Sequence, residues 1–253
     1  MIEEPYRWVE AIANRREYIE TQLAPGSPIA ALSYRDGILL VTLGQARQKL
    51  FEIYDRIALG AIGHPGDIER LRMAAIELAS TEGFTRSAAD VSLRRLAFYS
   101  LSPLLKTAFE QVYGAPYLAR MIFAEVGTTP ETDLFLRVEY DGAIAAQGAK
   151  QPSFCAISGT ARATEAMEEL LRRDHDPNAT LKQAVKVALD AWSAGSRPAD
   201  ENSSALPSAA ALSAFRDEKL RDATVEAAVL ERDATTSIRY RALTGDELNN
   251  LLA

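Results

Sequence analysis

The stretch APGSPIAALSYRDG, residues 24–37, decides how this chain folds. Its Ala-Pro-Gly start ends any preceding helix, because proline lacks a backbone donor and glycine accepts the conformation that commonly follows a helix. An apolar run comes next, and Arg35-Asp36-Gly37 then forms a tight turn before a second apolar run, GILLVTL. Two apolar runs that flank such a turn predict a β-hairpin.

The same stretch carries a candidate nucleophile, because Ser27 follows Gly26 directly. Cleavage between these two residues would give Ser27 a free α-amine beside its hydroxyl, and the two groups would form a nucleophile and its base. The residues therefore leave two alternatives open. One is a hydrolase with Ser27 at its mature N-terminus, and the other is a strand that begins after a loop.

The composition is that of an ordinary core-forming chain of 253 residues, with 47% hydrophobic and 25% charged residues. A net charge of −7 argues against a broad surface for nucleic acid or an anionic membrane. The single cysteine, Cys155, lies in an apolar run, so we expect it to be buried. The start lacks a signal-peptide pattern, and no apolar stretch is long enough for a membrane span, so we expect a cytoplasmic protein.

Hydrophobic periodicity predicts a helix before the hairpin and several after it. Residues 5–23 form an amphipathic pattern that places Trp8, Ile12, Ile19 and Leu23 on one face. The other predicted helices lie at 67–83, at 89–113 with a bend or break at Pro103, and at 160–173, 180–194 and 246–253.

Apolar runs bounded by turn residues predict the remaining strands. These runs occupy residues 49–55, 57–63, 117–127, 133–142, 153–159, 223–233 and 237–245. The segment from about 196 to 221 is rich in Pro, Ser and Ala, so we expect a surface loop there. Two separated helix pairs imply two covered sheet faces, since each sheet has an apolar face to bury. The sequence therefore predicts an α+β fold, a four-layer αββα sandwich with an extra N-terminal helix.

Lys49 is a candidate binding residue. It follows the polar segment 45–48 and begins an apolar strand pattern, where its ammonium would anchor a carboxylate, assist a nucleophile or protect a strand edge. The glycines of GAIGHPGD, residues 60–67, match neither the dinucleotide-binding nor the P-loop spacing. His175 between two aspartates is typical of a solvated loop. We therefore expect no cofactor and no bound metal.

Four segments together resemble the proteasome core-subunit family in their order and spacing. They are PIAALSYRDGILLVT (28–42), QKLFEIYDRIALGAIGHPGDIERLR (48–72), the strand pair YLARMIFAEVG and DLFLRVEYDGAIA (117–145), and FCAISGTARATEAMEELL (154–171). The resemblance covers about residues 5–252 apart from the expected loop. It implies the αββα sandwich of the N-terminal nucleophile hydrolases, the same order of layers that the patterns predict.

The family's catalytic β subunits lose a propeptide and expose a threonine nucleophile at the start of the first strand, supported by a lysine and an aspartate. In this sequence Ser27 would take the place of the nucleophile and Lys49 that of the lysine. Leu43 stands where the aspartate belongs and cannot hold an ammonium group. Pro28, with its fixed φ, constrains the backbone next to Ser27. A β-type hydrolase that uses Ser27 is the alternative interpretation.

The non-catalytic α subunits keep an N-terminal helix, and residues 5–23 favour this type, in its bacterial form. The resemblance then implies a gate segment and helix at 1–26 and an αββα domain at 27–253. It implies a homo-heptameric ring that stacks on proteasome β subunits, gates a 20S core particle for protein degradation and has no enzymatic activity of its own. Lys49 matches the lysine, in the pocket between α subunits, that receives the C-terminal carboxylate of a ring-shaped AAA ATPase activator.

Overall fold

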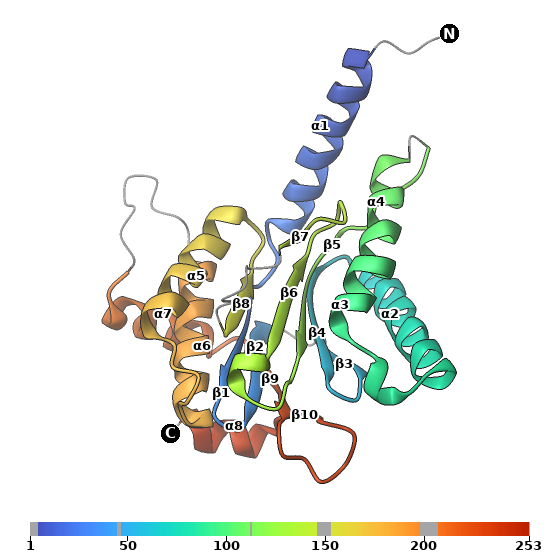
Figure 1. Ribbon diagram of the computed structural model, residues 1–253. Helices are drawn as coiled ribbons and strands as arrows, with labels where there is room; N and C mark the ends of the chain where they lie inside the picture. Colours follow the sequence, from blue (N-terminus) through green and yellow to red (C-terminus); the bar gives the residue numbers. More distant parts are fainter. Residues whose placement is uncertain (1–4, 45–46, 112, 146–152, 198–206, 253) are drawn as a thin grey trace.

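Two five-stranded antiparallel sheets lie face to face between two layers of helices (Figure 1). This computed structural model describes the chain except for residues 1–4, 45–46, 112, 146–152, 198–206 and 253, and except for the side chains of residues 5–7. The predicted αββα sandwich with an extra N-terminal helix is confirmed.

The first sheet is built on the predicted hairpin. Strands β1 (Ile29–Tyr34) and β2 (Gly37–Gly44) pair antiparallel without a shift of register. Every residue of β1 is buried, because one face packs on the second sheet and the other on helices. The strand order is β10 (Tyr240–Ala242), β9 (Thr224–Glu231), β2, β1 and β8 (Phe154–Ile157).

The second sheet follows the chain order of its strands. They are β3 (Leu50–Tyr54), β4 (Ile57–Gly63), β5 (Ala119–Glu125), β6 (Leu134–Val138) and β7 (Ile144–Ala145). The short strand β7 follows a turn at Gly142, whose φ of 81° is one that glycine adopts without strain. This sheet also starts one residue later than the pattern suggested, because Lys49 lies just before β3 and not in it.

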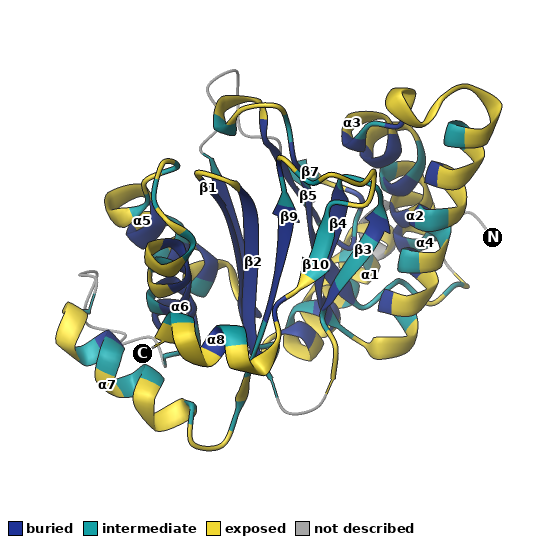
Figure 2. Cartoon of the chain, turned by 90° about the horizontal axis from the view of Figure 1, so that it is seen from below, coloured by how far each residue is buried: buried dark blue, intermediate teal, exposed yellow. Residues whose placement is uncertain are grey.

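Helices cover the outer face of each sheet, and buried residues fill all three interfaces between layers (Figure 2). Helices α5 (Ala161–Asp174), α6 (Leu181–Ser196) and α8 (Gly245–Leu252) pack on the first sheet. Helices α2 (Pro65–Thr85), α3 (Leu93–Leu96) and α4 (Ser102–Glu110) pack on the second.

The helix predicted at 89–113 is broken, as Pro103 suggested, but it starts later. A single 3₁₀ turn, Ala88–Asp90, precedes α3, and the Ser92 hydroxyl accepts the backbone N–H of Arg95 as an N-cap. A π-helical turn, Ala97–Leu101, then leads into α4, which has Pro103 in its first turn. The proline fits there because the first turn needs no backbone donor from it.

The prediction of a surface loop over 196–221 was wrong for the part that the structure describes. Helix α7 (Ala209–Lys219) occupies most of it and packs on α6. The Ser208 side chain caps its start, and Leu212 is buried against the first sheet's helical core. Alanine-rich composition favours a helix once an N-cap and an apolar contact are present, and both occur here. Residues 198–206 lie outside the described residues.

The predicted N-terminal helix is present as α1 (Pro5–Leu23), which projects from one end of the sandwich (Figure 1). Ile19 and Leu23 are buried against Phe109 and Tyr140. Trp8, expected on the same face, is 41% exposed, since the N-terminal half of the helix extends beyond the body of the chain.

Candidate functional site

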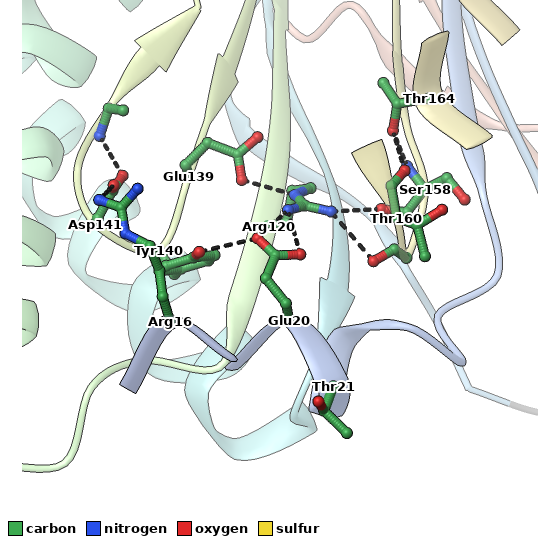
Figure 3. A network of polar contacts seen from close by, with 12 residues as sticks. Arg16, Glu20, Thr21, Arg120, Glu139, Tyr140, Asp141, Ser158, Thr160 and Thr164 are labelled. Carbon is green, nitrogen blue, oxygen red and sulfur yellow. Dashed lines mark hydrogen bonds and ion pairs between the residues drawn. The ribbon is translucent and has the colours of Figure 1, made fainter. Parts of the chain in front are cut away.

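A buried arginine joins α1 to both sheets. Arg120 on β5 is 6% exposed at its side chain and donates from all three guanidinium nitrogens (Figure 3). Its Nε donates to Glu139 at 2.6 Å, and its second terminal nitrogen donates to both carboxylate oxygens of Glu20 at 3.0 and 3.2 Å. Because Glu20 lies on α1, this contact ties the helix to the sandwich.

The remaining donor of Arg120 reaches the turn between β8 and α5. It contacts the backbone oxygen of Ser158 at 2.8 Å and that of Gly159 at 3.4 Å. A side chain at position 159 would collide with the backbone oxygen of Ala24, so glycine is needed for this close approach. Desolvation lowers the pKa of Arg120, but the charges and hydrogen bonds of Glu139 and Glu20 outweigh it and raise the pKa overall.

Further contacts fix the same half of α1. The hydroxyl of Tyr140 donates to Glu20 at 2.9 Å, and Arg16 pairs with Asp141 at 2.9 Å (Figure 3). The Arg16 guanidinium also lies 5.6 Å from the centroid of the Phe109 ring. Helix α1 is therefore an integral part of the fold over its C-terminal half.

Ser27 lies in the short linker between α1 and β1, with its hydroxyl fully engaged. The hydroxyl donates to the backbone oxygen of Leu43 at 2.6 Å and accepts the indole N–H of Trp192 at 3.0 Å. In the uncleaved chain the backbone nitrogen of Ser27 is an amide nitrogen, bonded to the carbonyl carbon of Gly26. An amide nitrogen cannot act as a base. Among the described residues no hydrogen bond joins Ser27 to Lys49. In the uncleaved chain this is the geometry of a structural serine.

Lys49 lies at the same end of the sandwich as this linker. Its backbone oxygen accepts from Ala61 on β4 at 3.0 Å, and a side chain on Gly26 would contact the next β4 residue, Ile62, at 3.3 Å. The gate helix predicted from the sequence and the candidate binding lysine are therefore brought together at one end. The sequence had no means of placing them there without the sheet topology.

The ammonium of Lys49 is half-buried and has no carboxylate within ion-pair distance among the residues that the structure describes. Burial lowers the pKa of Lys49 from its ordinary value of 10.5, and the more distant charge of Glu226 opposes this effect in part. A desolvated cation without an ion-pair partner favours an incoming anion. This arrangement can bind a carboxylate.

A cavity of about 410 Å³ opens next to the segment that contains Lys49; its lining includes the flanking residues Gln48 and Leu50 but not Lys49 itself. It is lined by Gly44, Arg47 and Gln48 around the turn from β2 to β3, and by Glu226 and Tyr240 from the edge of the first sheet. Arg47 adds a second positive charge to the lining. The cavity is large enough for the end of a peptide chain but not for a folded partner.

A larger cavity, about 780 Å³, lies at the opposite end of the strands, and its lining includes the ion pair of Arg232 and Asp133. Arg232 and Asp133 form two hydrogen bonds of 2.8 and 2.9 Å while both are buried. The Ser33 hydroxyl donates to the same carboxylate at 2.6 Å, and the backbone N–H of Gly127 does so at 2.9 Å. These charges serve the packing of the two sheets, so we assign the cavity no ligand.

The other chemical groups singled out from the sequence have structural roles. Cys155 is buried between the sheets, as expected, and burial raises its pKa to about 12. His175 Nε2 bonds to the backbone oxygen of Ser33, and burial lowers the pKa of the ring. No cluster of three or more metal-binding side chains occurs in the described part of the chain. Within that part, every helix is too short or too polar to cross a bilayer.

Sequence reasoning missed Arg120 and Glu226, although both leave a signal. Each is a charged residue inside an otherwise apolar strand pattern, ARMIFAE for Arg120 and TVEAAVL for Glu226. Buried charges are rare unless they are paired, so each one indicates a partner elsewhere in the chain. The identity of that partner depends on contacts between distant segments.

Two antiparallel sheets between helical layers, with a packed N-terminal helix, define a member of the αββα sandwich class. The comparison with known families agrees: the family described as "Proteasome subunit" matches residues 24–204. The chain belongs to the proteasome subunit family.

Its curated relatives are alpha subunits from bacteria. The "Proteasome subunit alpha" of Actinosynnema mirum is 33% identical, with 96% of this chain and 84% of the relative covered. Proteins of the same name from Parafrankia sp. and Streptomyces avermitilis are 30% and 31% identical, with 96% of this chain and 92% and 87% of the relatives covered. Because 96% of this chain is covered, the unmatched residues are fewer than the 19 residues of α1. At least part of α1 is therefore included in the match.

Proposed function

We propose that this chain is the non-catalytic α-ring subunit of a bacterial 20S proteasome core particle. Seven copies form a ring that stacks on a ring of β subunits, and proteolysis takes place at the N-terminal threonines of those partners. Residues 1–26 supply the gate segment and its helix, which restrict substrate access, and residues 27–253 supply the sandwich domain.

The observation that carries this proposal is the anchoring of α1 by Arg120. A chain that was processed after Gly26 would discard Glu20 and leave Arg120 without one of its two carboxylate partners, in a nearly fully buried position. Such a loss is costly. The names of the relatives support the α type as well.

We further propose that Lys49 receives the C-terminal carboxylate of a ring-shaped AAA ATPase. A charge-assisted hydrogen bond contributes about 1.5–3 kcal/mol when it is shielded from water. Seven such contacts around a ring convert weak individual binding into stable docking. The half-buried ammonium, and a cavity lined by the residues on either side of Lys49, support this role.

The subunit type is tested by the intact mass of the chain after co-expression with the β subunit from the same genome. We expect the full chain, or the full chain without Met1. Loss of the first 26 residues would expose Ser27 and refute the α assignment.

The docking role is tested with Lys49→Ala in the assembled core particle. We expect ATPase-stimulated protein degradation to be lost while ring assembly and cleavage of small peptides stay normal. Lys182→Ala, which removes an exposed lysine of α6, is the matched control and should behave like the wild type. Normal stimulation in Lys49→Ala would refute the docking site.

A further inference from the structure

The backbone on both sides of Lys49 is held by a carboxylate from another sheet. Glu226 lies on β9 of the first sheet, while Lys49 leads into β3 of the second. Its two oxygens accept the backbone N–H of Lys49, both at 3.0 Å, and one of them also accepts the N–H of Leu50 at 2.8 Å. One side chain therefore satisfies two consecutive backbone donors across the gap between the sheets.

The acceptors of this dipeptide are satisfied as well. The oxygen of Lys49 accepts from Ala61, and the oxygen of Leu50 accepts the Tyr240 hydroxyl at 3.0 Å and the Gln48 amide at 2.8 Å. All four backbone polar groups of Lys49 and Leu50 thus have partners. Of the polar groups of Lys49, only the ammonium has none among the described residues, so it is presented on a fixed backbone.

We infer that Glu226 is a positioning residue of the proposed activator site: it fixes the backbone of Lys49 so that the ammonium meets an incoming carboxylate without first having to be ordered. This inference rests on the proposed docking function. Ordering a long side chain and its backbone at the moment of binding reduces affinity, and preorganisation removes that cost. Glu226 is half-buried and belongs to the cavity lining, so it lies between the backbone of Lys49 and the cavity that an activator would enter.

Chemistry at Glu226 favours a positioning role over a direct ion pair with Lys49. The Glu226 carboxylate accepts hydrogen bonds from the backbone N–H groups of Lys49 and Leu50. It lies outside ion-pair distance of the Lys49 ammonium. Tyr240, whose pKa is raised to about 12 by burial and by the charges of Glu226 and Glu52, stays neutral and donates to Leu50.

Two measurements on the assembled core particle test this inference. The first is hydrogen–deuterium exchange of the segment that contains the Lys49 and Leu50 amides, which needs no activator. The second is the affinity of the AAA ATPase, measured from its stimulation of protein degradation. Glu226→Ala should speed exchange at these amides and weaken the ATPase affinity, each at least about tenfold.

Glu226→Gln keeps the size of the side chain, and it decides the matter if Glu226→Ala fails to assemble. Its single amide oxygen serves as acceptor where two oxygens served before, so we expect intermediate changes in both measurements. Glu52→Gln, which alters a partly buried carboxylate on β3, is the matched control and should change neither.

Two results would overturn the inference while the docking site stands: unchanged exchange in both Glu226 variants, or unchanged ATPase affinity in them while Lys49→Ala abolishes stimulation. Normal stimulation in Lys49→Ala overturns the docking site itself, and the role of Glu226 falls with it. The three outcomes are distinguishable because exchange is measured without the ATPase.

Discussion

Replacement of Arg120 by methionine should loosen the N-terminal helix and destabilise the whole chain. Methionine keeps much of the buried apolar stem but removes every donor that holds Glu20, Glu139 and the turn at Ser158. Removal of one partner from a buried ion pair costs about 3–5 kcal/mol, because the other charge is left without compensation. Glu20 and Glu139 are 42% and 22% exposed, so water will recover part of this loss. We therefore expect a decrease of about 2–4 kcal/mol in the free energy of unfolding.

Thermal unfolding of the isolated chain at fixed protein concentration measures this loss. For a domain of about this size each kcal/mol shifts Tm by roughly 2–4 °C, so Arg120→Met should lower Tm by about 5–15 °C. Arg16→Met is the matched control, since Arg16 makes an exposed ion pair from the same helix and should cost less than about 1 kcal/mol. Equal Tm values for the two variants would refute the conclusion that Arg120 anchors α1.

Three further predictions concern Ser27, Lys49 and Cys155. Ser27→Ala should destabilise the chain by about 1–3 kcal/mol in chemical denaturation, because Trp192 loses its acceptor, while peptide hydrolysis by the core particle stays unchanged. ATPase docking should weaken as pH rises through the lowered pKa of Lys49, since only the cation binds a carboxylate. Lys49→Arg should keep docking to higher pH when affinity is followed from about pH 7 to 10, and a parallel decline would contradict this. Cys155 should react with a thiol reagent only after unfolding, because burial raises its pKa to about 12, and rapid reaction of the native chain would count against its burial.

The fold could be predicted from the sequence because the local helix and strand patterns and the resulting order of layers indicate the same αββα sandwich. The hairpin at 24–44 combines a helix stop, two apolar runs and a turn with glycine at the end, and all of these point to the same structure. Helix α7 shows where this reasoning fails. A helix of 11 residues is marginal on its own whatever its composition, and α7 is stabilised by Leu212 and Phe215 against α6, a contact that periodicity cannot foresee.

The candidate site was less predictable, since its parts come from different sheets. Lys49 could be named from its place before a strand, but not its lack of an ion-pair partner, which depends on the distance to Glu226 nearly 180 residues later. The charges of Arg120 and Glu226 interrupt largely apolar strands, so the sequence indicates that each needs hydrogen-bond partners in the fold. The partners of these two residues come from distant segments of the chain, so only the folded topology identifies them.

The linker between α1 and β1 connects the two features on which the proposed function depends. Ser27 holds this linker to Leu43, and Leu43 is followed by Gly44, whose added side chain would lie 3.9 Å from the Lys49 ammonium. Only a few packed residues therefore separate Lys49 from the C-terminal end of α1. On the other side, Arg120 holds the same end of α1 to the second sheet. Ser27, which resembles a nucleophile in the sequence, is therefore better understood as a structural link between the segment of the proposed docking lysine and helix α1.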